Sequence, residues 1–270
     1  MRSLVNGRES SQVAAEDRGL TYGDGVFETM LARRGAIALW PRHLARLASG
    51  CERLYIAMPE GELLESELAQ LLEGWHECVV RLTLTRGPGA IGYAAGPAGT
   101  ATRIFVAREV PRIPERVDRI GIVAAWSELR LAAQPLLAGI KHLNRLEQVL
   151  ARAHAPPADE VLLADAEGRA VCAGAANLFA VIDGRLVTPS LERCGVAGVA
   201  RAVIVERLGA IVRDVAGDEL DTASEIFLSN AVRGVVPVAS IGERRYGVGP
   251  VAAAARAALA AEGFVPPRAA

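Results

Sequence analysis

The sequence predicts an α/β protein with two domains, and three observations support this. The 270 residues are 51% apolar and 23% charged, which is typical of a folded chain with room for two domains. Short strand-like segments alternate with longer segments of helical periodicity. Between residues 108 and 119 the chain is rich in proline and charge, and its two prolines exclude a continuous helix or central strand. We therefore expect a small α+β domain over residues 1–110, a linker over 111–119 and a larger α/β domain over 120–270.

The first domain contains two expected helices and four expected strands. Pro41 is suited to the first position of a helix, and Leu44 and Leu47 continue an apolar face from it. A second amphipathic helix is expected over residues 60–73. A glycine-rich loop over residues 86–99 separates the last two strands. The segments that alternate like short strands are 3–6, 37–39, 79–85 and 102–107.

The second domain combines hairpins with three expected helices. The pairs Glu167-Gly168 and Asp183-Gly184 are typical of tight hairpin turns. One helix is expected to begin just after Lys141, with an apolar face that includes Leu146, Val149 and Leu150. Two more helices are expected over residues 198–208 and 251–261. The expected strands are 120–125, 161–164, 170–173, 178–182, 185–188 and 225–228.

Composition excludes several classes of protein. With 30 basic and 31 acidic residues, the chain lacks the basic excess that nucleic-acid binding requires. The first eight residues contain no apolar core of a signal peptide, and the charge-free stretch 87–102 is too rich in Gly and Ala to span a membrane. The four cysteines and four histidines are scattered, which predicts reduced thiols, a cytoplasmic location and no metal site. We expect the partner to be a small molecule.

The use of basic residues is unusual, because Lys141 is the only lysine among the 30. Arginine keeps its proton, whereas a lysine amine can lose its proton and attack a carbonyl carbon. A lysine retained where arginine replaces every other one therefore indicates carbonyl chemistry at this position. The alternative is chance survival of a surface lysine at the start of a helix, although the helix dipole disfavours a cation there.

Other segments have the character of an anion-binding site. Gly195 and Gly198 precede a helix whose first N–H groups are suited to a phosphate, although such a pair of glycines also occurs in ordinary loops. Ser229 and Asn230, directly after a strand, add a hydroxyl and an amide. Arg46 lies on the polar side of its helix, where it is either solvated or placed to bind a phosphate.

Taken together, these positions are similar to motifs of the class IV aminotransferase-like family, whose members have pyridoxal-phosphate (PLP) fold type IV. The similarity covers nearly the whole chain in the same order, and residues 138–152 most resemble the bacterial 4-amino-4-deoxychorismate lyases of that family. The matching segments are Asp17-Arg18-Gly19, Tyr22-Gly23-Asp24-Gly25-Val26-Phe27-Glu28-Thr29, His43-x-x-Arg46-Leu47, Gly139-Ile140-Lys141-His142-Leu143-Asn144-Arg145-Leu146, Ala176-Asn177-Leu178-Phe179 and Gly195-Val196-x-Gly198-Val199-x-Arg201.

This resemblance implies a role for each matching residue. Lys141 would form the Schiff base with PLP and then act as acid and base, and Arg46 would bind the cofactor phosphate. The resemblance further implies PLP at the domain interface, a homodimer, and a lyase that releases pyruvate and makes 4-aminobenzoate for folate biosynthesis. The other residues that it implies around the phosphate are Gly198, Val199, Ala200, Ser229 and Asn230.

The sequence departs from the family at Cys172. Family members normally have a glutamate there, which pairs with the protonated pyridine nitrogen of PLP. A neutral thiol is a weak hydrogen-bonding partner, so the pyridine nitrogen would be less readily protonated. Transamination would suffer most from this loss, whereas a lyase driven by aromatisation would tolerate it. Cys172 is alternatively a small buried filler of the core.

A second departure is Ile91, where lyases of this group usually have an arginine before the final Gly-Tyr. That arginine is a natural partner for a substrate carboxylate. Arg86, Arg103 and Arg145 are the candidates to replace it, and Tyr93 is a further expected substrate contact.

Three functions remain open at this point. The first is a lyase acting on 4-amino-4-deoxychorismate or a close relative. The second is an aminotransferase for D- or branched-chain amino acids, which the loss of the glutamate disfavours. The third is a degenerate paralogue without turnover, which the retention of Lys141 disfavours.

Overall fold

A computed structural model describes residues 1–89, 92–95 and 99–268, and it divides the chain into two compact units. Unit 1 comprises Met1–Pro111 and Ile140–Asn144, and unit 2 comprises Arg112–Gly139 and Arg145–Ala270. This division differs from the expected domains in two places, since residues 112–119 of the expected linker belong to unit 2 and the segment that carries Lys141 belongs to unit 1. The reason is backbone pairing, because Phe27 N–H donates to the Lys141 carbonyl at 2.9 Å and Leu143 N–H to the Gly25 carbonyl at 3.0 Å.

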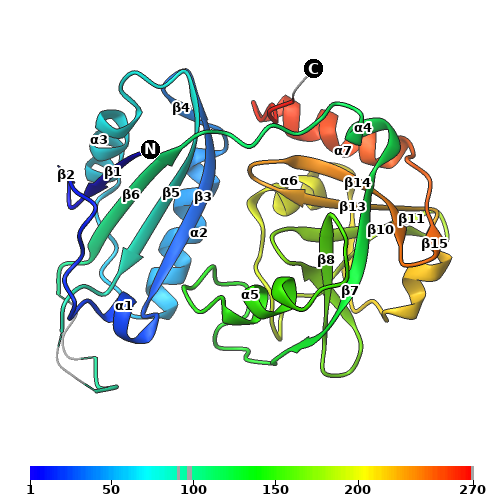
Figure 1. Ribbon diagram of the computed structural model, residues 1–270, viewed down its shortest axis with the longest axis horizontal. Helices are drawn as coiled ribbons and strands as arrows, with labels where there is room; N and C mark the ends of the chain where they lie inside the picture. The colour runs from blue at the N-terminus through cyan, green and yellow to red at the C-terminus, as the bar shows by residue number, and fades with distance from the viewer. Residues whose placement is uncertain (90–91, 96–98, 269–270) are drawn as a thin grey trace. The chain divides into compact units, whose positions relative to one another are not determined.

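Unit 1 is built on an antiparallel sheet in the order β2-β1-β6-β5-β3-β4 (Figure 1). Its central pair, β3 and β5, runs in register from Gly25 opposite Thr85 to Arg33 opposite Glu77. The strands are β1 (Arg2–Val5), β2 (Arg8–Glu9), β3 (Gly25–Arg33), β4 (Ala36–Ile37), β5 (Glu77–Thr85) and β6 (Thr102–Arg108). The helices are α1 (Arg18–Tyr22), α2 (Trp40–Arg53) and α3 (Gly61–Leu72).

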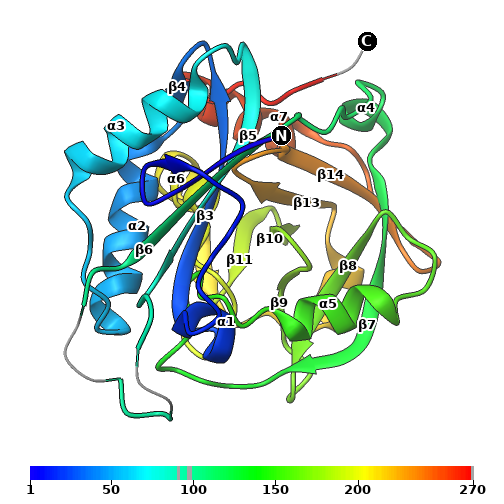
Figure 2. The same cartoon turned by 60° about the vertical axis from the view of Figure 1, so that its left-hand side comes forward.

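Helices α2 and α3 cover one face of this sheet, as Figure 2 shows. Alternate residues of the strands point to that face, since successive side chains of a strand lie on opposite sides. Met30, Leu82 and Phe105 from the strands pack with Leu47 and Leu64 from the helices in one buried cluster. The opposite face of the sheet therefore carries the other set of alternating residues, which includes Phe27.

Unit 2 contains a strongly curved sheet. Because β9 pairs with both β8 and β10, the strands β10, β13, β14, β7, β8 and β9 close into a barrel. The strands are β7 (Ile122–Leu131), β8 (Glu160–Asp165), β9 (Ala170–Ala173), β10 (Asn177–Ile182), β11 (Arg185–Pro189), β12 (Ile211–Arg213), β13 (Glu225–Asn230), β14 (Gly234–Ile241) and β15 (Arg244–Arg245).

Helices α6 and α7 pack outside the barrel strands, whereas α4 and η1 contribute Val117 and Leu220 to the buried cluster of the barrel. Leu162, Leu178, Ile226 and Val238 belong to one buried cluster of the barrel, and α6 and α7 contact the other side of β13. On that outer side the rings of Phe179 and Phe227 stack at 5.0 Å between centroids. The helices are α4 (Val117–Ile120), α5 (Leu146–Ala153), α6 (Val199–Leu208), the 3₁₀ helix η1 (Asp218–Thr222) and α7 (Pro250–Ala261).

The mixed α/β prediction is confirmed, as are both hairpin turns and the two helices expected in unit 1, which are α2 and α3; α1 was not predicted. The prediction of a helix directly after Lys141 was wrong. Residues 140–144 are extended because they pair with β3, and α5 begins only at Leu146. Its apolar residues Leu146, Val149 and Leu150 are exposed on this chain instead of lying in the core.

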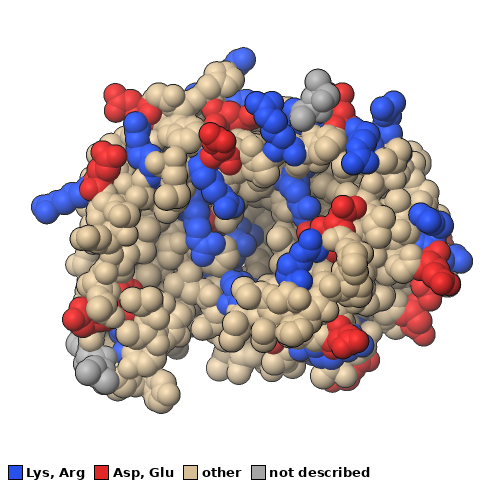
Figure 3. All heavy atoms as spheres, viewed as in Figure 1, with Lys and Arg blue, Asp and Glu red and all other residues tan. Residues whose placement is uncertain are grey.

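Three further observations concern the surface charge, the length of the helices and possible metal ligands. Basic and acidic groups both occur on the face drawn in Figure 3, with much uncharged surface among them. Within the described ranges, no helix combines the length and apolarity needed to cross a bilayer. The same residues contain no cluster of His, Cys, Asp or Glu that could hold a metal ion.

Candidate active site

Lys141 lies on a short extended segment of unit 1. The neighbouring His142 forms an antiparallel bridge with Val26 at the start of β3. The Lys141 side chain is half-buried, and its Nζ lies 4.2 Å from the centroid of the Phe27 ring. The backbone around Lys141 is fixed by its hydrogen bonds to Gly25 and Phe27 of β3. The amine can therefore reach only positions near the Phe27 ring.

Unit 2 holds the residue just before this segment. Gly139 has a φ of +80°, which favours glycine, and its N–H donates to the Gly195 carbonyl at 3.0 Å. The Ala197 N–H in turn donates to the Gly139 carbonyl at 3.0 Å. The lysine motif and the glycine motif, which are more than fifty residues apart in sequence, are therefore joined by backbone hydrogen bonds.

Arg46 of α2 is held by a buried carboxylate in unit 1. Its Nε donates to Glu28 Oε1 at 2.7 Å, and its Nη2 forms an ion pair with the same carboxylate. Glu28 also contacts His43 Nδ1 at 2.7 Å, and both Glu28 and His43 are almost fully buried. Burial raises the pKa of Glu28, but Arg46 and His43 together lower it by a larger amount. The pKa of Glu28 is therefore below its ordinary value. Glu28 therefore remains ionised and fixes the Arg46 guanidinium.

A row of three side chains crosses adjacent strands of unit 2. Asn177 on β10 is the register partner of Cys172 on β9 and of Ser229 on β13. Register partners lie on the same face of a sheet with their Cβ atoms about 5 Å apart. The structure thus brings together two residues, Cys172 and Ser229, that the sequence placed near the cofactor on separate grounds.

The start of α6 lies beside this row. Asn177 Nδ2 donates to the Val196 carbonyl at 2.8 Å, in the loop that leads into the helix. Gly198 is the N-cap of α6 and no described side chain caps it, so the first N–H groups, of Val199 and Ala200, have no acceptor within the helix. This is the arrangement that binds phosphate in many proteins.

The two residues at the end of β13 differ in what they contact. Ser229 is 1% exposed and its Oγ has no hydrogen-bond partner among the described residues. A buried hydroxyl without a protein partner is costly, so it suits a ligand oxygen that would accept its hydrogen bond. Asn230 is already engaged, since its Oδ1 accepts from the N–H groups of Val232 and Arg233 and its Nδ2 donates to the Ala175 carbonyl. Ser229 rather than Asn230 is therefore the side chain that fits a phosphate oxygen.

Cys172 is a neutral thiol. Burial, followed by the proximity of Cys194, raises the pKa of the Cys172 thiol to about 12, although Arg145 opposes this shift. Burial also lowers the pKa of Arg145, while Cys172 and Glu147 raise it. A thiol with such a pKa carries no charge near neutral pH.

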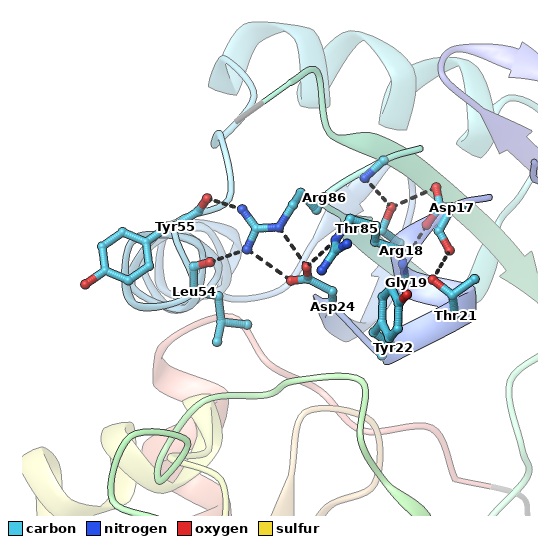
Figure 4. Close-up of polar contacts among 12 residues, drawn as sticks. Asp17, Arg18, Gly19, Thr21, Tyr22, Asp24, Leu54, Tyr55, Thr85 and Arg86 are labelled. Carbon is cyan, nitrogen blue, oxygen red and sulfur yellow. Dashed lines mark hydrogen bonds and ion pairs between the residues drawn. The ribbon is translucent and has the colours of Figure 1, made fainter. Parts of the chain in front are cut away.

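Arg86 is occupied by other parts of unit 1, as Figure 4 shows. Its Nε donates to Asp24 Oδ2 at 2.7 Å, and its terminal nitrogens donate to the carbonyls of Leu54 and Tyr55, each at 2.6 Å. A guanidinium satisfied in this way holds the end of α2 to the strand end. These contacts favour a structural role for Arg86.

The remaining substrate candidates have diverse surroundings. Arg103 forms a buried ion pair with Glu67 of α3, with Nη2 and Oε1 2.7 Å apart. Tyr93 is 91% exposed, and its ring lies 5.7 Å from that of Tyr22. Ile91 lies outside the described residues. The structure therefore leaves Arg103 in the core of unit 1, away from solvent.

Two residues of the site, Glu28 and Asn177, belong to motifs of the sequence, but no role was predicted for either of them. Glu28 orients Arg46, and Asn177 links Cys172, Ser229 and the α6 loop. Their spacing in sequence contains no signal of either contact, because both depend on strand register. Their position inside family motifs was the only available indication.

The chain is similar to known proteins along most of its length. Residues 25–241 match the family model described as amino-transferase class IV. The chain is 33% identical over 250 residues to an aminodeoxychorismate lyase from Vibrio harveyi, and the match covers 88% of this chain and 90% of that protein.

Solved structures of similar proteins cover nearly the whole chain. The 4-amino-4-deoxychorismate lyase from Pseudomonas aeruginosa matches with a TM-score of 0.90 and 43% identity, over 95% of this chain and 97% of that one. A branched-chain amino acid aminotransferase from T.th., solved with pyridoxamine 5′-phosphate, matches with a TM-score of 0.84 and 26% identity, over 98% and 95% of the two chains.

Proposed function

Because the chain belongs to the class IV aminotransferase family, with PLP fold type IV, we propose that it is a lyase that converts 4-amino-4-deoxychorismate to 4-aminobenzoate and pyruvate. The chain is a PLP-dependent enzyme, as the members of this family are. The proposal concerns the reaction, the substrate and the residues that act on it. Folate biosynthesis is the pathway that would use this product.

The residues present fit PLP. Lys141 offers the amine for the covalent link, and in unit 2 the N–H groups at the start of α6 suit a phosphate, as does the Ser229 hydroxyl, which lacks a partner among the described residues. In unit 1 the Arg46 guanidinium, oriented by Glu28, is a second phosphate donor. When bound, PLP supplies an electron sink for charge on the carbon next to the amine.

Lys141 would move the protons of the reaction. As a base it removes the proton from the ring carbon that bears the amine, and the carbon–oxygen bond to the enolpyruvyl group then breaks. The ring becomes aromatic, and a proton returned to the enolpyruvyl methylene yields pyruvate. The contact of Nζ with the Phe27 ring limits the directions from which the Lys141 amine can reach the substrate.

The neutral thiol of Cys172 is the observation that carries a lyase in preference to an aminotransferase. Without a carboxylate at this position, the pyridine nitrogen of PLP is less readily protonated and charge on the substrate carbon is less stabilised. Transamination depends on that stabilisation in both of its half-reactions. Aromatisation provides its own driving force, so the lyase reaction depends on it less.

The experiment is to supply 4-amino-4-deoxychorismate to the PLP-loaded enzyme and to measure both products. We expect 4-aminobenzoate and pyruvate in equal amounts, with slow amino-group exchange between D-alanine or a branched-chain amino acid and a keto acid. Rapid exchange without pyruvate release from 4-amino-4-deoxychorismate would overturn the lyase in favour of the aminotransferase. A protein that binds PLP and catalyses neither reaction would be a degenerate paralogue.

Replacement of Cys172 with glutamate is expected to raise amino-group exchange about tenfold or more relative to lyase activity, because it restores a carboxylate in the row beside Asn177. Cys172→Ser is the matched control, since it changes the size of the side chain little and introduces no charge. The ratio of the two rates is measured together with the visible absorption of PLP. An unchanged ratio and spectrum in Cys172→Glu would show that residue 172 does not contact the cofactor.

Gly198→Ala is expected to raise the dissociation constant for PLP at least about tenfold. A Cβ at this position would lie 1.9 Å from Asn177 Oδ1, and overpacking of this kind costs about 1–3 kcal/mol. The backbone φ of −69° is open to alanine, so the effect is steric. Gly61→Ala at the start of α3 is the control, because no described atom lies within 4 Å of its Cβ. Equal PLP affinity in both variants would count against a phosphate at α6.

We also propose that the enzyme is a homodimer, as the family resemblance implies. The exposed apolar residues Leu146, Val149 and Leu150 on α5 support this, because an apolar stripe on a helix is normally covered. Light scattering at micromolar concentration would give the mass of two chains, and a monomer mass would contradict the proposal.

A further inference from the structure

The segment that follows α7 returns to β14, the strand that pairs with the site strand β13. Phe264 is fully buried, and residues 264–268 have no regular secondary structure. Gly234 begins β14 with a φ of +69°, and a Cβ at this position would lie 3.1 Å from both Phe264 Cε1 and Pro266 Cβ. The segment is therefore packed closely against the first residue of β14, a strand that α4 and α7 also contact (Figure 1).

Arg268 binds both a carboxylate and the backbone at this place. Its Nε and Nη2 donate to the two carboxylate oxygens of Asp118 on α4, each at 2.9 Å. Its Nη1 donates to the Arg233 carbonyl at 3.2 Å, and its Nη2 donates to the Val235 carbonyl at 3.4 Å. The Arg268 side chain is 12% exposed. Because the donors of a guanidinium lie in a rigid plane, contacts on two sides fix it in one orientation.

The backbone that Arg268 binds is the part of β14 that faces the site strand. Val235 is the register partner of Ser229, and Gly234 is that of Asn230. On its other side β14 pairs with β7 from Val238 on, so the Val235 carbonyl precedes that pairing. Val235 is fully buried, and a buried carbonyl without a donor is costly. Arg268 supplies a donor here and thereby fixes the start of β14 beside Ser229.

Arg233, in the turn between β13 and β14, is held by three separate contacts. Its N–H donates to Asn230 Oδ1 at 2.7 Å, and its side chain forms an ion pair with Glu160 on β8. Its carbonyl accepts from Arg268. The turn that begins directly after Ser229 and Asn230 therefore has little freedom to move while Arg268 is bound to it.

The Ser229 hydroxyl depends on this backbone for its position. Its Oγ has no hydrogen-bond partner among the described residues, so none of the contacts in that part of the chain aims the hydroxyl at a ligand. Its place is set by β13 and by the strand paired with it. Hydrogen bonds between oxygens span about 2.5–3.0 Å, so a displacement of about 1 Å is enough to lose one.

We propose that Arg268 is a positioning residue for the cofactor phosphate, because it fixes the turn after β13 and with it the Ser229 hydroxyl. The proposal rests on the phosphate contact of Ser229 in the proposed function, and it is independent of the reaction and of the substrate. Arg268 itself contacts no part of PLP. Asp118 shares this role, since it holds the guanidinium against the two carbonyls.

Titration of the cofactor-free protein with PLP and with pyridoxal tests the proposal. Pyridoxal has the same ring and aldehyde but no phosphate, so an effect that acts through the phosphate contact is confined to PLP. Arg268→Gln is expected to raise the dissociation constant for PLP about three- to tenfold and that for pyridoxal less than about twofold. Arg268→Lys should recover part of the loss, since it keeps a cation beside Asp118. Arg213→Gln is the matched control, because Arg213 forms a similar two-bond pair with Glu219 at β12 and η1, outside β13 and β14.

A double-mutant cycle with Ser229→Ala separates positioning from general stability. In the Ser229→Ala background, Arg268→Gln should change the dissociation constant for PLP by less than about twofold, because the hydroxyl that it positions is absent. Equal losses in both backgrounds, or equal losses for PLP and pyridoxal, would overturn the role of Arg268. An Arg268→Gln variant that binds PLP as the wild type does, while Ser229→Ala binds it more weakly, would overturn this role and leave the phosphate contact of Ser229 in place.

Hydrogen–deuterium exchange of the PLP-loaded protein measures the freedom of the turn directly. Arg268→Gln is expected to speed exchange about tenfold in peptides that cover residues 229–236, whereas Arg213→Gln leaves these peptides unchanged. Unchanged exchange in Arg268→Gln would overturn the proposal. None of these measurements requires turnover. A protein without lyase activity that shows the coupling between Arg268 and Ser229 would overturn the proposed reaction alone.

Discussion

Replacement of Lys141 with alanine is expected to lower the rate of 4-aminobenzoate formation at least about a thousandfold. In the proposed mechanism the variant loses both the link to PLP and the general acid and base, and proton transfer by a positioned side chain contributes about 10²–10⁴-fold by itself. The proposed phosphate contacts of Arg46 and α6 would remain, so PLP should still bind without the covalent link. The measurements are the rate of product formation and the visible absorption of the bound cofactor.

The identity of the linked residue can be read directly, because the chain has one lysine. Borohydride reduction followed by mass spectrometry should place a single PLP adduct on Lys141 in the wild type and none in Lys141→Ala. Lys141→Arg is the matched control, since it retains a long cationic side chain that cannot form the link. An adduct at another residue, or activity in Lys141→Ala within tenfold of the wild type, would remove the basis of the proposed mechanism.

Replacement of Glu28 with glutamine is expected to reduce the free energy of unfolding by about 3–5 kcal/mol, because Arg46 and His43 would lose a shared buried partner. The affinity for PLP should fall as well, since Arg46 would no longer be oriented. Urea unfolding of the cofactor-free protein and titration with PLP measure the two effects separately.

The contribution of Glu28 should depend on pH in a defined direction. Its pKa is lower in the folded chain than in the unfolded chain, so between the two values the unfolded state binds more protons and stability rises with pH. The difference in stability between wild type and Glu28→Gln is therefore expected to be full above the ordinary glutamate pKa of about 4.3 and to shrink as the pH falls further. A difference that grows on acidification would contradict this.

Glu67→Gln is the matched control for Glu28. Glu67 also forms a buried ion pair with an arginine in unit 1, so its replacement should destabilise the fold to a similar degree. It does not contact Arg46, and the affinity for PLP should stay within about twofold. Loss of PLP affinity in both variants would mean that Glu28 acts through general stability and not through Arg46.

Several parts of the fold could be predicted because their signals are local. The helix that begins near Pro41 and the hairpins at Gly168 and Gly184 follow from residues adjacent in sequence. β3 and β14 were not predicted. β3 is buried along most of its length and so lacks clean alternation, and β14 contains Pro237, which argues against a strand.

The region after Lys141 shows why a periodic pattern can mislead. Leu146, Val149 and Leu150 have helical spacing, and they do lie on a helix, but on an exposed face of it. Residues 140–144 pair with β3 instead of continuing a helix. The backbone hydrogen bonds that they form with this strand outweigh the local preference for a helix. The spacing of apolar residues does not show whether a segment will form a helix or pair with a distant strand.

By itself, the sequence identified the residues on which the proposed chemistry rests, namely a lone lysine in a specific motif, the glycines before α6 and Ser229. The tertiary structure decided which groups are available to carry it out. Arg86 and Arg103 are neutralised by Asp24 and Glu67, whereas the Ser229 hydroxyl has no hydrogen-bond partner among the described residues. The physical reason is that ion pairing and strand register join residues distant in sequence, and the spacing of residues along the chain does not record those contacts.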